Sequence, residues 1–243
     1  AHLHWSIDQS LVRLGMTHVD VFIAHRNDAH TPLEETLVAL DAIVRSGKAR
    51  YLGVSNWPAW KIAAAVELQR ANGWAPFSHV QMYYSLLGRG VEGEVAAMLG
   101  HYGLGLTAWS PLTGGFLSGK YTPASLTDAD NRLSGFDMLP FDKDKGFALV
   151  ETMRGIAAAH GASVAQVALA WVLSRRHVAS VLIGASKMTQ LDDNLAAADL
   201  ALTPHDLATL DAATKPEFDF IYNVSRVPDG PIVNALAAKP GDR

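Results

Sequence analysis

VDVFIAH, at residues 19–25, is a mainly apolar run that ends in a histidine and is followed by turn-forming residues. Such a run is typical of a strand buried on both faces rather than of an alternating surface strand. Apolar residues at helical spacing predict a short helix before it, from an N-cap at Ser6 to Gly15. A second helix is predicted at residues 31–47, and a strand at 51–56 follows it directly. The predicted strand at residues 19–25 therefore belongs to a series of alternating helices and strands.

The same alternation continues along most of the chain. Further helices are predicted at about residues 58–71, 91–102, 145–160, 163–174, 188–198 and 204–213, and further strands at 79–84, 105–110 and 180–184. A loop rich in Gly, Ser, Thr, Asp and Pro interrupts the series from residue 112 to about 144, and loops of this length are usually functional. Strands that alternate with helices predict a parallel sheet with right-handed crossovers.

The expected fold class is α/β, and a barrel is favoured over an open nucleotide-binding sheet. No Gly-x-Gly-x-x-Gly follows a predicted strand, so the dinucleotide fingerprint of the open sheet is absent. A (β/α)8 TIM barrel needs eight strands, and the five predicted here would leave two unpaired edges that invite association into a homo-oligomer. We expect a single domain over residues 1–243, with a tail, residues 215–243, lying over the barrel.

Composition and charge exclude several classes of function. The chain has 20 Lys and Arg against 24 Asp and Glu, a formal net charge of −4, and no basic run that would follow a nucleic-acid backbone. It contains no cysteine, which excludes disulfides, thiolate catalysis and cysteine-bound zinc. No apolar segment reaches the roughly 18 residues of a membrane span, so we expect a soluble, cytoplasmic protein without membrane or nucleic-acid partners. The first residues, AHLHW, show neither an initiator Met nor a signal-peptide pattern, so we expect residues upstream.

Polar residues close the predicted strands in an otherwise apolar setting. In a parallel barrel the active site lies at the carboxyl ends of the strands, so these residues would converge on one mouth. They are the run HRND at 25–28, Ser55 and Asn56, Gln81, the run WSPL at 109–112 and the run GASK at 184–187. A metal-dependent hydrolase is disfavoured and no metal site is predicted, because neither a His-x-His nor a carboxylate pair stands at a strand end.

Successive segments resemble, in order and spacing, the signatures of the aldo-keto reductase family, up to about residue 215. They are VFIAHRND at 21–28, GKARYLG at 47–53, GVSNW at 53–57, AWSPL at 108–112, GGFLSGKY at 114–121 and IGAS at 183–186. The most similar branch contains bacterial oxidoreductases and potassium-channel β subunits. The resemblance implies that the chain supplies strands 4 to 8 of the (β/α)8 barrel. About 90 to 100 upstream residues would then carry three further units, with the catalytic Tyr, Lys and Asp.

His25 resembles the catalytic histidine of that family, which orients the substrate carbonyl beside a tyrosine acid. The role has a physical basis, because a neutral imidazole N–H can donate to a developing oxyanion at neutral pH. The alternative is a histidine at a strand end whose ring is satisfied by a backbone carbonyl. Asn27 stands where the family usually has Pro, and this departure affects the stiffness of the loop rather than the chemistry.

The resemblance also implies residues that bind the nicotinamide end of NADP(H). Ser55, Asn56 and Gln81 match hydrogen-bonding partners of the carboxamide, which offers two donors and an acceptor. Trp109 matches a residue that lies flat against the nicotinamide ring, where an indole gives a broad rigid surface. Ordinary strand-end caps and a core tryptophan are the alternatives.

Two further groups match contacts to the rest of the cofactor. Contacts to the pyrophosphate are implied for residues after the fourth predicted strand and in the long loop: Ser110, Pro111, Leu112, Gly114, Lys120 and Arg132. Contacts to the adenosine and its 2′-phosphate are implied around the start of the helix near Met188, where backbone N–H groups favour an anion: Gly184, Ser186, Lys187, Gln190, Asp193 and Asn194. A solvated lysine and an exposed helix face are the alternatives.

The function implied is an oxidoreductase that transfers a hydride between NADPH and an aldehyde or ketone. The rival is a non-catalytic nucleotide-binding or partner-binding barrel remnant that lacks the catalytic Tyr, Lys and Asp. The sequence leaves the carbonyl substrate, the preference for NADP over NAD and the oligomeric state open.

Overall fold

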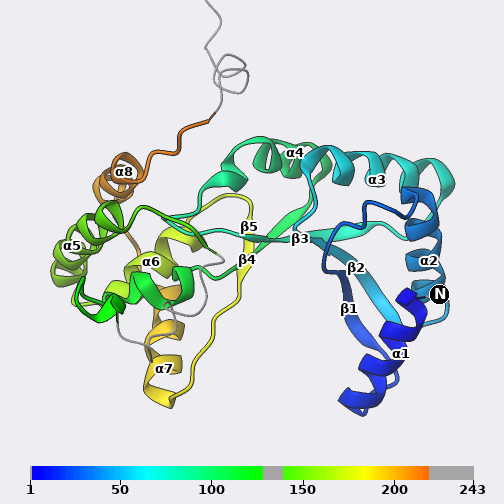
Figure 1. Ribbon diagram of the computed structural model, residues 1–243, viewed down its shortest axis with the longest axis horizontal. Coiled ribbons are helices and arrows are strands. Elements are labelled where there is room, and N and C mark those ends of the chain that lie inside the picture. The colour runs from blue at the N-terminus through cyan, green and yellow to red at the C-terminus, as the bar shows by residue number, and fades with distance from the viewer. Residues whose placement is uncertain (1, 128–138, 219–243) are drawn as a thin grey trace, which may run out of the picture.

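The computed structural model describes residues 2–127 and 139–218, and shows an α/β fold built on a five-stranded parallel sheet (Figure 1). The strands lie in chain order, β1-β2-β3-β4-β5. Their bounds are β1 Val19–Ala24, β2 Ala49–Ser55, β3 Phe77–Tyr83, β4 Gly105–Trp109 and β5 Val178–Val181. The predicted parallel sheet is therefore confirmed. The predicted tail is described only as far as residue 218, and Arg132 lies outside the described residues.

Helices alternate with the strands as predicted. The α-helices are α1 His2–Leu14, α2 Leu33–Arg45, α3 Ala59–Asn72, α4 Glu94–Tyr102, α5 Lys143–His160, α6 Val164–Leu173, α7 Met188–Ala196 and α8 Pro204–Ala213. Short 3-10 helices are η1 Gly90–Glu92, η2 Thr113–Ser118, η3 Ser125–Thr127 and η4 Ala197–Asp199. In Figure 1, α2, α3 and α4 follow one another along one side of the sheet, and α5, α6 and α8 lie together at the left of the view, where α6 packs against β5.

The first helix begins earlier than predicted. α1 starts at His2, so Ser6 lies inside the helix and is not its N-cap. The Ser6 hydroxyl instead lies 3.4 Å from Nε2 of His2, one turn earlier, and the His2 ring stacks on Trp5. The serine pattern was misleading because Ser is tolerated inside a helix when its hydroxyl finds a partner one turn away.

The prediction that β1 is buried on both faces is wrong for this sheet. Val21 is 38% exposed and Asp20 is also exposed, and the neighbouring Tyr51 on β2 is 59% exposed. The cause is topological, since β1 lies at the edge of the sheet and pairs only with β2 in the described residues. Ala24 is buried in the core, and Phe22 and Val19 pack against it. The face that carries Val21 and Tyr51 is open.

The core lies between the sheet and its helices. Leu52 and Val54 of β2 pack with Leu40 of α2 and Ile62 of α3, and each of these side chains is fully buried. Burying one such side chain contributes about 1.5–3 kcal/mol, so this layer fixes the sheet against its helices. It also fixes the positions of the strand ends, from which the site is built.

α6 is the most enclosed helix, with eight of its ten residues buried. It begins with a capping box in which Ser163 and Gln166 satisfy each other's backbone N–H groups. In the described part of the chain no single helix is long and apolar enough to cross a membrane. The pair α5 and α6 passes that test of length and composition only when taken together, across a bend of 92°.

Candidate functional site

The carboxyl ends of the strands bring the predicted polar residues to one edge of the sheet. Ser55 of β2 pairs in register with Gln81 of β3, and the backbone N–H of Asn56 donates to the carbonyl of Gln81 at 3.3 Å. Trp109 closes β4 in register with Tyr83. His25 directly follows β1 and is exposed. Parallel register is therefore what gathers side chains from distant parts of the sequence.

Asn56 connects three of these strand ends. Its side-chain amide donates to the Ser55 hydroxyl at 2.8 Å and to the carbonyl of His25 at 3.4 Å, and its amide oxygen accepts from Nε1 of Trp109 at 3.1 Å. Asn56 has a φ of 57°, a left-handed conformation that Asn adopts more readily than most residues. This backbone turn directs the amide along the sheet edge, between His25 and Trp109.

Trp109 rests against Tyr83, with ring centroids 5.2 Å apart and planes 38° from parallel. The Tyr83 hydroxyl accepts from the Ser85 hydroxyl at 3.1 Å and shares a hydrogen bond with the Thr113 hydroxyl at 3.2 Å. Burial raises the pKa of Tyr83 above its ordinary value, so the phenol is neutral at physiological pH. Thr113 is fully buried with a φ of 49°, so this hydroxyl cluster anchors the turn that follows β4.

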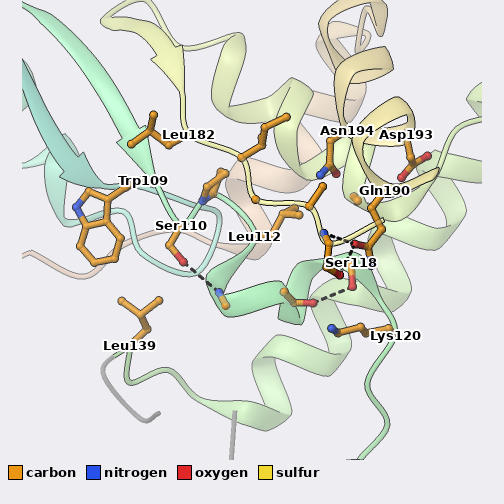
Figure 2. A pocket seen from close by; sticks show the side chains of 18 of the residues that line it. Trp109, Ser110, Leu112, Ser118, Lys120, Leu139, Leu182, Gln190, Asp193 and Asn194 are labelled. Carbon is orange, nitrogen blue, oxygen red and sulfur yellow. Dashed lines mark hydrogen bonds between the residues drawn. The ribbon is translucent and has the colours of Figure 1, made fainter. Parts of the chain in front are cut away.

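A cavity of about 730 Å³ opens beside Trp109 and runs toward α7. Figure 2 shows Trp109 and Leu182 toward one end and Gln190, Asp193 and Asn194 toward the other. The predicted cofactor residues that line it are Trp109, Ser110, Pro111, Leu112, Gly114, Lys120, Gly184, Ser186, Gln190, Asp193 and Asn194. A cavity of this size suits an organic cofactor or substrate.

The turn after β4 forms one wall of the cavity. The Ser110 hydroxyl accepts from the backbone N–H of Gly114 at 3.1 Å, as the dashed line in Figure 2 shows. Four residues of this turn have positive φ values and fold the chain back on itself: Ser110 at 52°, Thr113 at 49°, Gly114 at 65° and Gly115 at 95°. Ser110, Pro111, Leu112 and Gly114 of this turn line the cavity.

The opposite wall comes from α7 and the segment before it. Gln190 accepts from both the backbone N–H and the hydroxyl of Ser186, at 3.0 and 3.1 Å, and so closes the start of the helix. Asp193 accepts from the Ser163 hydroxyl at 2.8 Å and from the Gln166 amide at 2.9 Å. Two predicted adenosine contacts are therefore already engaged in hydrogen bonds within the protein.

The other predicted residues that the structure describes do not line the cavity. Four of them stand at the sheet edge: His25, Ser55, Asn56 and Gln81. The hydrogen bond between Asn56 and Trp109 connects this edge to the cavity. Lys187 is exposed at the N-cap of α7 and makes no side-chain cap bond there. Sequence reasoning missed Gly115, Ser118, Leu139, Lys143, Ala165, Leu182, Ile183 and Ala185, which also line the cavity. Most of these adjoin predicted residues, but no sequence signal marks Lys143 or Ala165.

A lysine holds the loop that carries His25. Lys61, on α3, donates to the Asn27 side chain and, at 3.0 Å, to the carbonyl of Asp28. The Thr31 hydroxyl and the backbone N–H of His30 both donate to the Asp28 carboxylate, and they hold the pKa of Asp28 below its ordinary value. Asn27 therefore does have a structural partner where the family pattern has Pro. Among the described residues no cluster of three His, Cys, Asp or Glu could hold a metal ion.

Comparison with known proteins adds a family match. A family model described as "Aldo/keto reductase family" matches residues 1–215. A probable voltage-gated potassium channel subunit beta from Oryza sativa subsp. japonica is 37% identical over 222 residues, 88% of this chain and 67% of that protein. An L-glyceraldehyde 3-phosphate reductase from Escherichia coli (strain K12) is 38% identical over 216 residues, 85% of this chain and 61% of that protein.

A fungal protein is similar over a comparable length, at a lower identity. A versiconal hemiacetal acetate reductase from Aspergillus parasiticus is 33% identical over 218 residues, 89% of this chain and 63% of that protein. The chain thus spans between 61% and 67% of the length of these three relatives.

Proposed function

The chain belongs to the aldo/keto reductase family, and on that premise we propose that it is an NADP-dependent oxidoreductase that transfers a hydride between NADPH and an aldehyde or ketone. Two of the similar proteins are named as reductases, one of versiconal hemiacetal acetate and one of L-glyceraldehyde 3-phosphate, which supports this class of reaction. The whole protein would have the (β/α)8 barrel, with the five strands described here as strands 4 to 8. The open face of the sheet, which carries Val21 and Tyr51, would then be covered inside that barrel.

The observation that carries the proposal is the hydrogen bonding of Asn56. It joins the loop of His25, the predicted carboxamide contact Ser55 and the predicted stacking residue Trp109 at one sheet edge. A carbonyl carbon must lie beside the nicotinamide ring for hydride transfer, so the histidine and the ring platform must be neighbours. His25 and Trp109 are more than 80 positions apart in sequence, and the Asn56 side chain bonds both the backbone carbonyl of His25 and the indole of Trp109, which supports the proposal.

The residues along the cavity fit a dinucleotide. The cavity has an indole at one end and amide side chains at the other end. A tight backbone turn and a lysine lie along its length. That order matches a nicotinamide ring, a pyrophosphate and an adenosine. When bound, NADPH supplies the hydride, and the oxidised form accepts it in the reverse reaction.

The chain's own residues would then orient the reactants. Trp109 fixes the face of the nicotinamide ring, and Ser55, Asn56 and Gln81 offer polar atoms to its carboxamide. His25 would donate from its imidazole to the carbonyl oxygen, on which negative charge develops as the hydride arrives. Asn56 would have to exchange its present bonds to Ser55 or Trp109 for the carboxamide.

A second candidate function is that of a nucleotide-binding subunit that associates with another protein and does not turn over substrate. The similarity to a probable potassium channel subunit favours it, at 37% identity. Both candidates predict NADPH binding, so only a measurement of turnover separates them.

The test uses the protein expressed from its complete gene. NADPH binding is measured by the change in nicotinamide fluorescence, and turnover by the loss of nicotinamide absorbance with a panel of aldehydes and ketones. Trp109→Ala should weaken NADPH binding about tenfold or more, whereas Trp60→Ala, which removes an exposed tryptophan on α3, should not.

The role of His25 needs a second comparison. His25→Ala should lower turnover by about 10²–10⁴-fold with little change in NADPH affinity. His18→Ala, just before the opposite end of β1, is the control. Binding without turnover of any carbonyl would leave the subunit function standing, and absence of binding would reject both.

A further inference from the structure

We propose that Lys143 is a phosphate-binding residue of the dinucleotide site, an inference that rests on the proposed function. Lys143 is the first residue of α5 and lines the cavity, although no sequence motif points to it. Among the described residues that line the cavity, it and Lys120 are the cations. A dinucleotide phosphate would therefore meet two ammonium groups from different parts of the chain.

Aromatic contacts hold the Lys143 side chain in place. Its ammonium lies 3.7 Å from the centroid of the Phe141 ring, and Phe141 packs edge-on against the buried Phe116 at 4.7 Å. A Cβ atom at Gly146 would lie within 2.9 Å of both rings, so the helix backbone is pressed against the same two phenylalanines. A cation fixed over a ring loses less freedom on binding an anion than a solvated lysine does.

None of the described carboxylates neutralises the charge of Lys143. In the described part of the chain no carboxylate forms an ion pair with Lys143 or with Lys120. The neighbouring Asp142 carboxylate caps α5 by accepting from the backbone N–H groups of Asp144 and Lys145, each at 3.0 Å. The carboxylate that lines the cavity in the described part of the chain, that of Asp193, accepts from Ser163 and Gln166.

Lys120 is likewise held over an aromatic ring beside the cavity. Its ammonium lies 4.8 Å from the centroid of the Tyr121 ring and near Gly115, which also lines the cavity. Two lysines held over aromatic rings on one cavity suit a polyanion, since each can donate to a different oxygen. Among dinucleotide groups only the diphosphate and the 2′-phosphate offer that charge.

α5 provides a matched control. Lys145, two residues further along, has the same charge and is exposed, but it does not line the cavity. Dissociation constants for NADPH, ADP and adenosine 2′,5′-bisphosphate are measured calorimetrically for the unaltered protein, Lys143→Met, Lys143→Arg and Lys145→Met. Thermal unfolding of each variant shows whether the fold is retained.

Lys143→Met should weaken NADPH binding about tenfold and reduce its dependence on salt, because one charge-assisted hydrogen bond is lost. Lys143→Arg should retain most of the affinity, and Lys145→Met should stay within about twofold of the unaltered protein. Weakening for ADP as well assigns Lys143 to the diphosphate. Weakening for the 2′,5′-bisphosphate but not for ADP assigns it to the 2′-phosphate.

Two failures are distinguishable. If the unaltered protein binds NADPH and Lys143→Met binds as tightly as Lys145→Met, the role of Lys143 is rejected and the proposed function stands. If the unaltered protein binds none of the three ligands, the proposed function is rejected and the role of Lys143 with it.

Discussion

The Ser163 hydroxyl donates to the Asp193 carboxylate at 2.8 Å, and this bond joins the start of α6 to α7. The Gln166 amide donates to the same carboxylate at 2.9 Å and to the Asp193 carbonyl at 3.0 Å. Ser163 and Gln166 also form the capping box of α6, so α7 is attached to a helix end that is itself fixed. Asp193 therefore sets the position of the cavity wall that carries Gln190 and Asn194.

Asp193→Ala should lower the free energy of unfolding by about 1–3 kcal/mol, because Ser163 and Gln166 each lose an acceptor. NADPH affinity should fall several-fold, since α7 is no longer held against α6. Chemical unfolding and NADPH titration measure the two effects. Asp192→Ala, on the exposed neighbour, is the control. A stability equal to that of the control would show that the bond does not hold α7.

Tyr83 supports Trp109 with its ring more than with its hydroxyl. Tyr83→Phe should cost only about 1 kcal/mol, because the Ser85 and Thr113 hydroxyls are 2.9 Å apart and satisfy each other. Tyr83→Leu also removes the ring beside Trp109, and should raise the KM for NADPH more than Tyr83→Phe does. Steady-state kinetics of the two variants decide the point. Equal KM values would mean that the ring does not orient Trp109.

Much of this architecture follows from the sequence alone. Apolar runs that end in polar residues identify the strands, and parallel connections bring those ends to one edge, which places Ser55, Gln81 and Trp109 together. The bounds of the strands differ by a few residues because pairing, not composition, ends them. β2 begins at Ala49 rather than Tyr51, since the edge strand β1 pairs with it from there.

Other features depend on neighbours that a local pattern does not identify. The exposure of Val21 depends on which strands flank β1, and an apolar run does not contain that information. Helical spacing places Gln190, Asp193 and Asn194 on one face of α7, but it does not show that Asp193 bonds to α6. Lys143 reaches the cavity only because α5 returns to it after the long loop.

Gly88 is required by the position of Tyr83. A Cβ atom at Gly88 would lie 2.1 Å from Cε1 of Tyr83, and the ring is held by its hydroxyl bonds and by Trp109. Gly88→Ala should therefore destabilise the fold by about 1–3 kcal/mol or more. Gly90→Ala, where an added Cβ meets nothing within 4 Å, should be close to neutral.

The double variant Gly88→Ala with Tyr83→Leu tests the cause. Removing the ring should recover part of the loss, so the double variant should be more stable than the sum of the single effects predicts. Urea unfolding of the three proteins measures the coupling. Strict additivity would mean that Gly88 is needed for its backbone and not for the space beneath it.

Asp206 should make the stability of the protein depend on acid pH. Its carboxylate accepts from the hydroxyl and backbone N–H of Thr203, at 2.6 and 2.9 Å, and from Nε2 of His160 at 2.9 Å. The Thr203 hydroxyl is the largest cause, and together these donors lower the pKa of Asp206 from 3.8 to about 2, against the opposing effect of burial. The folded state therefore holds the proton less tightly than the unfolded chain.

A lowered pKa stabilises the fold above the unfolded value and loses that effect as the pH falls through the folded value. Asp206→Asn should cost about 2 kcal/mol at neutral pH, with about half of that difference remaining near pH 3. Urea unfolding of the unaltered protein and of Asp206→Asn, between roughly pH 7 and pH 3, measures this difference in the free energy of unfolding. Asp192→Asn is the exposed control. A difference that stays constant over this range would mean that the loss comes from the packing of α8 against α5, and not from the charge of Asp206.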